Sequence, residues 1–182
     1  MKIIHLILYN MSTSKLTPQQ FAIRFGAFAR ETEEKTGISA LAILAQAALE
    51  SGWGQFAPGN MFFGVKDSDG VNGNEQLLTT TEYSKRYDLK FPVIISIEPV
   101  IRNGEKYFQY RVKDYFRRYN TPEESFTDHA NLFVRVKRYS KAMKVKNDAF
   151  MFIDEIAAAG YATDPNYAAK LKQIAKLIQK YL

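Results

Sequence analysis

The sequence contains no cysteine and only two histidines, His5 and His129. The absence of cysteine excludes disulfides, thiolate zinc sites and a cysteine nucleophile. Two histidines are too few for a metal centre that depends on imidazole ligands. We expect His129 to lie on a helix face and to make one hydrogen bond. Ser125 is close to it in sequence, but no nucleophile-elbow motif surrounds Ser125, so we do not expect a Ser-His-Asp site. We therefore predict no metal site and no cofactor.

Long apolar runs are also missing, because no stretch reaches the roughly 18 residues that a membrane span needs. The N-terminus, MKIIHLILYN, resembles a short signal peptide, but it contains a histidine and lacks a small-x-small cleavage site. We expect residues 1–16 to be an N-terminal extension and residues 17–182 to form one domain, without membrane insertion. Export by another route, a role in a phage and a different start site all stay open.

Charge and composition limit the class of protein and its partners. Hydrophobic residues make up 46% of the chain and charged residues 24%, which is typical of a globular domain rather than a disordered one. The net charge of +6 suits an anionic partner, such as nucleic acid, an acidic membrane surface or a bacterial cell wall. It suits simple solubility equally well. We do not expect nucleic-acid binding, and we expect a monomer.

Capping signals predict a helix that begins directly after Thr17. Thr17 can cap the helix, Pro18 suits its first position, and Gln20 completes a capping box. Gly37 is expected to end this helix, since glycine readily adopts the left-handed backbone found there. Ser39 then begins a second helix, whose sequence is almost wholly apolar.

The middle of the chain has the pattern of a small antiparallel sheet. The segments rich in β-branched and aromatic residues are strand candidates at 76–83, 91–97 and 106–116. Asn103-Gly104, between the last two segments, is a strong hairpin-turn signal. The region therefore predicts a hairpin with one further strand.

Helix signals return after this β region. A second capping box begins at Thr121, Asn147 can cap a helix that Gly160 ends, and Asp164 with the proline after it opens a last helix. Helices on both sides of a short β region indicate an α+β fold, with a mainly helical lobe and a small antiparallel β lobe.

Glu50 stands at the C-terminal end of the second helix, in the stretch LAQAALESGWG. Its apolar surroundings disfavour the ionised carboxylate. The helix dipole places partial negative charge at the same end, and no lysine or arginine lies between residues 39 and 55 to offset it. These effects raise the pKa of Glu50 and favour a protonated carboxyl group near neutral pH, as a general acid requires. An exposed glutamate at a frayed helix end is the alternative.

Aromatic residues follow Glu50 directly. Trp53 and Phe56 lie in a glycine-rich turn, where their faces could stack on pyranose rings. Gln46 lies one helical turn before Glu50 and could hydrogen-bond its carboxyl group or a sugar hydroxyl. Together these residues indicate a sugar-binding site.

Four blocks of sequence are distinctive when they are taken in order. The first is ALAILAQAALESGWGQ followed by GNMFFGVK, and the second is TTTEY at residues 79–83. The third is VKDYFRRYNTPEESFTDHANLF at 112–133, and the fourth is GYATDPNYAAKL at 160–171. This arrangement resembles the family 73 glycoside hydrolases, which are bacterial endo-β-N-acetylglucosaminidases. The resemblance covers the chain from about residue 17 to its end.

The resemblance implies a lysozyme-like fold whose lobes flank an active-site cleft. It implies hydrolysis of the β-1,4 bond between N-acetylglucosamine and N-acetylmuramic acid in peptidoglycan glycan strands. The site of action would be the cell wall, reached in the periplasm, by secretion or with a phage. By motif position, Glu50 is the general acid, Glu82 the second carboxylate and Tyr161 a further catalytic residue. The predicted substrate-binding residues are Gln46, Trp53, Asn60, Phe62, Phe63, Asn166 and Tyr167.

Several alternatives stay open. A retaining mechanism, an inverting mechanism and a substrate-assisted route through the 2-acetamido group all fit the residues. At least one of Phe62 and Phe63 could belong to the core instead of the cleft. The segment 84–111 is longer than the family pattern and has no assigned role. A lytic transglycosylase and a non-catalytic module for wall binding or assembly are the alternative functions.

Overall fold

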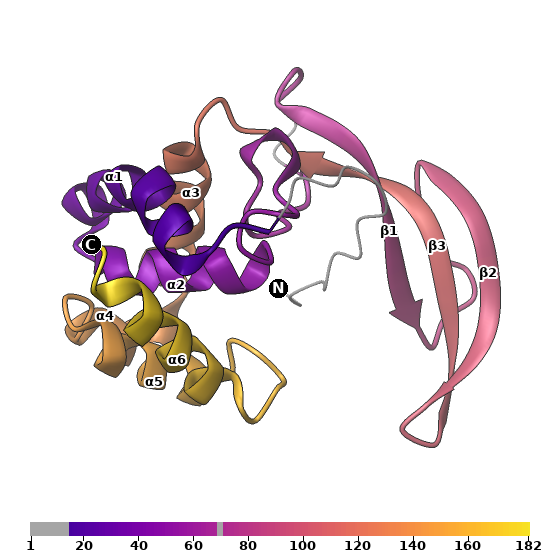
Figure 1. The fold of residues 1–182 in the computed structure, drawn as a ribbon. Helices are drawn as coiled ribbons and strands as arrows, with labels where there is room; N and C mark the ends of the chain where they lie inside the picture. Colours follow the sequence, from indigo (N-terminus) through magenta and orange to yellow (C-terminus); the bar gives the residue numbers. More distant parts are fainter. Residues whose placement is uncertain (1–14, 69–70) are drawn as a thin grey trace. The chain divides into compact units, whose positions relative to one another are not determined.

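The computed structural model describes residues 15–68 and 71–182 of the chain. These residues divide into two compact units. The helical unit comprises residues 15–63 and 119–182, and the sheet unit comprises the remainder (Figure 1). A mainly helical unit and a small antiparallel sheet in one chain confirm the α+β class that the sequence predicts.

The helical unit is built from α-helices with two short 3₁₀ helices. Its elements are α1 (Pro18–Thr36), α2 (Ala40–Glu50), η1 (Pro58–Asn60), α3 (Pro122–Arg135), η2 (Lys137–Tyr139), α4 (Ser140–Lys144), α5 (Ala149–Ala158) and α6 (Tyr167–Gln179). No helix within the described residues combines the length and the apolar character that crossing a membrane requires.

Helix α1 begins and ends as its capping signals predict. The Thr17 hydroxyl accepts a hydrogen bond from the Gln20 backbone at 3.2 Å, and the Gln20 side chain accepts one from the Thr17 backbone at 2.9 Å. Gly37 ends the helix with a left-handed φ of 72°. This defined exit turns the chain directly into α2.

Helix α2 is the central element of the helical unit. It contacts α1, α3, α5 and α6, and every residue from Ala42 to Ala48 is at most 3% exposed. A helix that is apolar on all sides must be surrounded by other elements, which explains its composition. Ser39 precedes it as expected, although the Ser39 side chain makes no capping hydrogen bond.

Aromatic rings fill the space around α2. Phe62 lies at the centre of this core, with ring centroids 5.0 Å from Phe25 and 5.0 Å from Phe126. Both contacts are edge-to-face, the geometry that the ring quadrupoles favour. The loop that follows α2 is therefore fastened to α1 and α3 through its phenylalanine side chains.

The sheet unit is a three-stranded antiparallel sheet of β1 (Glu75–Ser84), β2 (Val93–Arg102) and β3 (Glu105–Arg117). Its order is β1-β3-β2, so the strand that comes last in the sequence lies in the middle (Figure 1). The predicted turn at Asn103-Gly104 joins β2 to β3, with positive φ values of 51° and 77°.

The register of the sheet places charged residues from separate segments on one face. Glu82 is opposite Tyr110, and Asp114 stands four residues further along β3. Side chains alternate between the faces of a strand, so Glu82 and Asp114 share a face. Lys66 forms an isolated bridge opposite Phe116 and projects from that face too.

Two features of the structure differ from the sequence expectations, and a third expectation falls largely outside the described residues. Asp148, not Asn147, caps α5, because its side chain accepts hydrogen bonds from the backbone amides of Phe150 and Met151 at 3.0 and 2.9 Å. Strand β2 continues beyond residue 97, up to Arg102. The predicted N-terminal extension lies outside the described residues apart from positions 15 and 16, so the domain boundary stays a prediction.

Candidate active site

Glu50 is the last residue of α2, and the helix end that carries it is held in place. Ser51 is fully buried; its hydroxyl donates to the Ala47 carbonyl at 2.6 Å and accepts from the Gly54 backbone at 2.9 Å. Burial raises the pKa of the Glu50 carboxyl group from 4.5 to about 7, partly offset by a hydrogen bond from Tyr167. These features exclude a frayed, solvated glutamate.

The turn after Glu50 has an unusual backbone. Gly52, Trp53 and Gly54 all have positive φ, at 58°, 62° and 80°. Glycine tolerates this conformation, but tryptophan is strained in it. The Trp53 ring lies edge-on to Phe21, with centroids 5.7 Å apart, and is neither fully buried nor fully exposed. The turn thus fixes the backbone next to Glu50 at an energetic cost.

Tyrosine side chains lie beside Glu50. Tyr167, the first residue of α6, donates a hydrogen bond to the Glu50 carboxyl group and accepts one from Gln46 Nε2 at 3.1 Å. Tyr161, in the loop before α6, is 6% exposed, and its ring centroid is 5.4 Å from that of Tyr167. Burial raises the pKa values of both phenols, so both stay protonated.

The structure therefore brings Gln46, Glu50, Tyr161 and Tyr167 together in the helical unit. Gln46 and Glu50 lie in α2, more than 100 residues before Tyr161 and Tyr167 in the sequence. Only Gln46 and Glu50 share a helix, where they occupy neighbouring turns on one side. The spacing of the two tyrosines cannot reveal this meeting, whereas the family resemblance does place both near the site.

The other predicted substrate-binding residues have varied surroundings. Asn60 Nδ2 donates to the carbonyl groups of Tyr119 and Asn120, each at 3.0 Å, and so closes a loop. Phe62 and Phe63 are 3% and 9% exposed and belong to the aromatic core, the alternative left open for them. Asn166 is exposed before α6. As substrate contacts, all of these residues stay predictions.

Glu82 belongs to an ion-pair cluster on the sheet unit. Lys66 Nζ lies 2.9 Å from Glu82 Oε1 and 2.5 Å from Asp114 Oδ2. The same ammonium group lies 4.4 Å from the centre of the Phe116 ring. One cation thus serves two carboxylates on a half-buried face. The sequence did not predict Lys66 and Asp114 as neighbours of Glu82, although both fall within the family-like blocks and strand alternation places Asp114 on the same face as Glu82.

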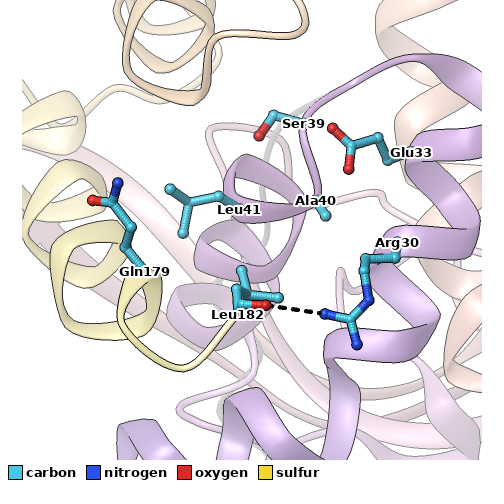
Figure 2. Close-up of a pocket in the computed structure, with 7 residues that line it drawn as sticks. All are labelled: Arg30, Glu33, Ser39, Ala40, Leu41, Gln179 and Leu182. Atoms are coloured by element: carbon cyan, nitrogen blue, oxygen red, sulfur yellow. Dashed lines mark hydrogen bonds between the residues drawn. The ribbon is translucent and has the colours of Figure 1, made fainter.

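A cavity of about 260 Å³ lies at the other end of α2 (Figure 2). Arg30 and Glu33 of α1 line it together with Ala40, and Arg30 donates to the Leu182 carbonyl at 3.4 Å. Ala40 begins α2 and Glu50 ends it, which separates the two regions by about 15 Å of helix. The cavity is therefore distinct from the group of residues around Glu50.

A carboxyl group kept protonated near pH 7 in a half-buried, tyrosine-lined setting is typical of the general acid of glycoside hydrolases. A family model described as mannosyl-glycoprotein endo-beta-N-acetylglucosaminidase matches residues 26–180. The chain belongs to this glucosaminidase family of glycoside hydrolases.

Relatives of known name agree with this membership. The chain is 32% identical to peptidoglycan hydrolase FlgJ of Pseudomonas aeruginosa and 31% identical to exo-glucosaminidase LytG of Bacillus subtilis. The matches cover 84% and 93% of this chain but only 35% and 54% of those proteins.

A solved structure shares the fold. The glycoside hydrolase domain of FlgJ from Salmonella typhimurium superimposes with a TM-score of 0.67 at 31% identity, covering 91% of this chain and 90% of that one. The expected lysozyme-like α+β fold is thereby confirmed.

Proposed function

We propose that this protein hydrolyses the β-1,4 bond between N-acetylglucosamine and N-acetylmuramic acid in peptidoglycan, with Glu50 as the general acid. The observation that carries the proposal is the Glu50 carboxyl group, whose pKa burial raises to about 7. Membership of the glucosaminidase family and the names of the relatives support the substrate. Its place of action would be the cell wall, and the route of export is not part of the proposal.

Glu50 would protonate the glycosidic oxygen as the bond to the leaving sugar breaks. A group with a pKa near the working pH can give up its proton and regain it in each cycle. The hydrogen bond from Tyr167 persists after the proton leaves and would stabilise the resulting carboxylate. Burial thus raises the pKa of Glu50 and Tyr167 lowers it. The first effect would keep the proton on Glu50 before transfer, and the second would stabilise the carboxylate afterwards.

The group that assists attack at the anomeric carbon is proposed to be Glu82. In this role it would orient or activate water, as in an inverting glycosidase. Lys66 Nζ lies 2.9 Å from Glu82 Oε1 and would hold this side chain in place. In a substrate-assisted route, the 2-acetamido group would attack instead and Tyr161 would orient it. Glu82 would then contribute much less to the rate than Glu50.

Digestion of purified peptidoglycan, followed by mass spectrometry of the products, tests the proposal. We expect fragments with reducing-end N-acetylglucosamine from the wild type and none from Glu50→Gln. Glu34→Gln is the matched control, because it makes the same chemical change on an exposed position of α1. Anhydro-muramic ends would identify a lytic transglycosylase, and binding without release of fragments would identify a non-catalytic module.

The same digest separates internal from terminal cleavage. The family description names an endo-acting enzyme, whereas one relative is named an exo-acting one. An endo-acting enzyme releases a broad range of glycan lengths at early times, and an exo-acting enzyme releases small units only. We propose endo cleavage, which the early products would support or contradict.

A further inference from the structure

The net positive charge of the protein comes from one short segment. The chain has 25 lysines and arginines against 19 acidic residues. Six of these cations and no acidic residue lie between positions 129 and 147, so cations and acidic residues are equal in number, 19 of each, in the rest of the chain. The six cations are Arg135, Lys137, Arg138, Lys141, Lys144 and Lys146. The excess charge is therefore concentrated around η2 and α4 in the helical unit.

Some cations of this segment have a role within the fold. Lys146 Nζ donates to the Thr36 carbonyl at 2.8 Å, at the end of α1. Arg138 donates to the Tyr139 hydroxyl at 2.5 Å and lies over the ring, 4.7 Å from its centre. These contacts explain why two of the cations are present, but they do not account for the lysines of η2 and α4.

Lys137, Lys141 and Lys144 form a basic stripe along η2 and α4. The two helices are consecutive, and residues three or four positions apart lie on the same side of a helix. All three lysines are exposed, whereas Tyr139 and Ala142 on the other side are at most 1% exposed. The stripe is about 12 Å long, from the rise per residue of the two helix types.

The charges of the basic stripe are not neutralised by their neighbours. None of its ammonium groups makes an ion pair or a side-chain hydrogen bond with another residue in the described part of the chain. The acidic residues that flank the segment are engaged elsewhere, since Asp128 accepts from the Tyr119 hydroxyl at 2.7 Å and Asp148 caps α5. The stripe therefore presents three unpaired positive charges to the solvent.

This arrangement differs from the other charged helix surfaces. In α1, Glu31 and Lys35 use the same spacing to form an ion pair at 2.9 Å, and Lys172 of α6 pairs with Asp154 of α5 at 2.7 Å. Like charges at this spacing repel one another and destabilise a helix, and a bound polyanion would relieve the repulsion. The basic stripe is therefore suited to an anionic partner.

The surroundings of the stripe limit the chemistry of that partner. Phe133 and Tyr139 are buried, so the segment offers no phenyl or phenol ring on which the bases of a single-stranded nucleic acid could stack. Val134 is the only large hydrophobic side chain exposed between residues 129 and 147, which is too little to enter a lipid surface. The surface thus recognises charge alone, which favours anionic groups repeated along a hydrophilic chain.

We propose that the basic stripe is a docking surface for the carboxylate groups of the peptide stems in peptidoglycan. The proposal rests on the proposed function, which brings the protein to this polymer, and it adds a second contact apart from the sugar-cleaving site. Each stem carries more than one carboxylate, so neighbouring lysines can bind groups of the same stem. Exposed ion pairs are individually weak, so they would retain the enzyme on the wall without fixing it at one position.

Co-sedimentation with peptidoglycan that carries no attached phosphate polymer tests the surface. Glu50→Gln is the starting protein, so that the polymer stays intact during the assay. The stripe variant adds Lys137→Gln, Lys141→Gln and Lys144→Gln. We expect it to bind about tenfold more weakly at low salt, because three exposed ion pairs are lost. The difference should disappear at about 1 M salt, where charges are screened within a few ångströms.

Two further variants separate the stripe from net charge and from damage to the fold. The matched control makes the same change at exposed lysines outside the segment: Lys90→Gln, Lys106→Gln and Lys176→Gln. A control that loses as much binding as the stripe variant would overturn the proposal, because total charge would then suffice. The second variant keeps the charge of the stripe, with Lys137→Arg, Lys141→Arg and Lys144→Arg. It should bind like the starting protein, and a folded arginine variant as weak as the glutamine variant would also overturn the proposal.

Changes to the polymer identify the anionic group. Conversion of the peptidoglycan carboxylates to amides should abolish the difference between the stripe variant and its control. A difference that persists on the amidated polymer would overturn the proposal. Phosphatidylglycerol vesicles and single-stranded DNA are the alternative probes, and tighter stripe-dependent binding to either would show a different partner.

Kinetics distinguish failure of this inference from failure of the proposed function. With Glu50 intact, the stripe variant should raise KM for peptidoglycan and leave kcat unchanged, because the stems lie away from the bond that breaks. An unchanged KM would contradict the docking role. If the wild type releases no fragments, the proposed function fails, and the co-sedimentation results still decide whether the basic stripe binds the wall.

Discussion

The two units of this protein treat ionisable groups in opposite ways. The helical unit buries the Glu50 carboxyl group, two tyrosine phenols and the His129 imidazole, and this burial keeps them neutral. On the sheet unit, Glu82 is part of a half-exposed cluster of ions centred on Lys66. A shifted pKa requires removal from water, whereas a stable charge requires a partner. The division therefore suits an acid on one unit and a carboxylate on the other.

Further ion pairs in the sheet unit follow the same pattern. Lys85 pairs with Glu105 at 2.8 Å and Arg86 pairs with Asp88 at 2.8 Å, all with exposed side chains. Such pairs contribute little to folding because water screens them. The sheet unit thus carries its charge at low cost, whereas the helical unit gives up stability to keep Glu50 out of water.

The comparison predicts, first, very unequal effects on turnover. Glu50→Gln should lower kcat by about 10³-fold or more, since general acid catalysis and the charge that follows it are both lost. Glu82→Gln should cost about 10- to 100-fold, because positioned water retains part of its reactivity. Release of reducing ends from purified peptidoglycan measures both effects, with circular dichroism as the folding control. An equal loss in the two variants would break the proposed division of roles.

The second prediction concerns stability against pH. The folded state binds the Glu50 proton more tightly than the unfolded state, with a pKa of about 7 instead of 4.5. Below pH 4.5 Glu50 is protonated in both states and does not reduce stability. Between pH 4.5 and 7 the free energy of unfolding falls, and above pH 7 the full loss of stability remains. Glu50→Gln should therefore stabilise the protein at pH 8 by on the order of 2–3 kcal/mol and hardly at all at pH 4.

Urea denaturation at the two pH values measures this difference. Glu82→Gln is the contrasting variant, because it breaks a half-exposed ion pair and should destabilise the protein at pH 8 by about 1 kcal/mol or less. A Glu50→Gln protein that is less stable than the wild type at pH 8 would show that Glu50 is solvated in the folded state.

The third prediction isolates the hydrogen bond from Tyr167 to Glu50. Tyr167→Phe removes the group that lowers the pKa of Glu50, so that pKa should rise by about one pH unit. Activity that depends on protonated Glu50 should then persist to higher pH, and the basic limb of kcat/KM against pH reports the shift. Tyr181→Phe, just beyond the end of α6, is the matched control and should leave the limb unmoved. A shift of the basic limb to lower pH would contradict the assignment of Tyr167 as the group that lowers the pKa of Glu50.

The smallest expected effect comes from the ions of the sheet unit. Lys66→Met should destabilise folding by about 1 kcal/mol or less, because the group is partly exposed and its removal leaves two carboxylates on one face. Lys85→Met should cause no measurable change. Thermal unfolding at low and high salt distinguishes the pairs, since screening should narrow the gap between Lys66→Met and the wild type. A large effect that is independent of salt would point to packing on Phe116 instead.

Local chemistry accounts for what could be predicted from the sequence. The capping box at Thr17, the end of α1 at Gly37 and the hairpin turn at Asn103 are set by neighbouring residues, and each is confirmed. Asn147 was wrong by one position because asparagine and aspartate both cap helices, and the choice depends on where the backbone turns. The raised pKa of Glu50 was also predictable, since its apolar helix and the lack of nearby cations are visible in the sequence.

Contacts between distant segments could not be predicted from spacing. The orphaned nitrogen of His129, its bond to Tyr161 and the shared use of Lys66 by Glu82 and Asp114 depend on tertiary packing and on strand register. The strand order β1-β3-β2 is of the same kind, because β1 skips its neighbour in sequence to pair with β3. Such features follow from the global fold, which local signals restrict but do not determine.

The left-handed backbone at Trp53 has a consequence for laboratory evolution. A tryptophan with a φ of 62° carries roughly 1–2 kcal/mol of strain, which glycine at the same position would relieve. Trp53→Gly would also remove the ring contact with Phe21, and this loss of packing offsets the relief of strain. Random mutagenesis that is screened only for heat resistance at neutral pH should therefore enrich Glu50→Gln and not Trp53→Gly. A screen for both heat resistance and wall cleavage should discard Glu50→Gln, and the positions lost between the two screens would show where stability is given up for activity.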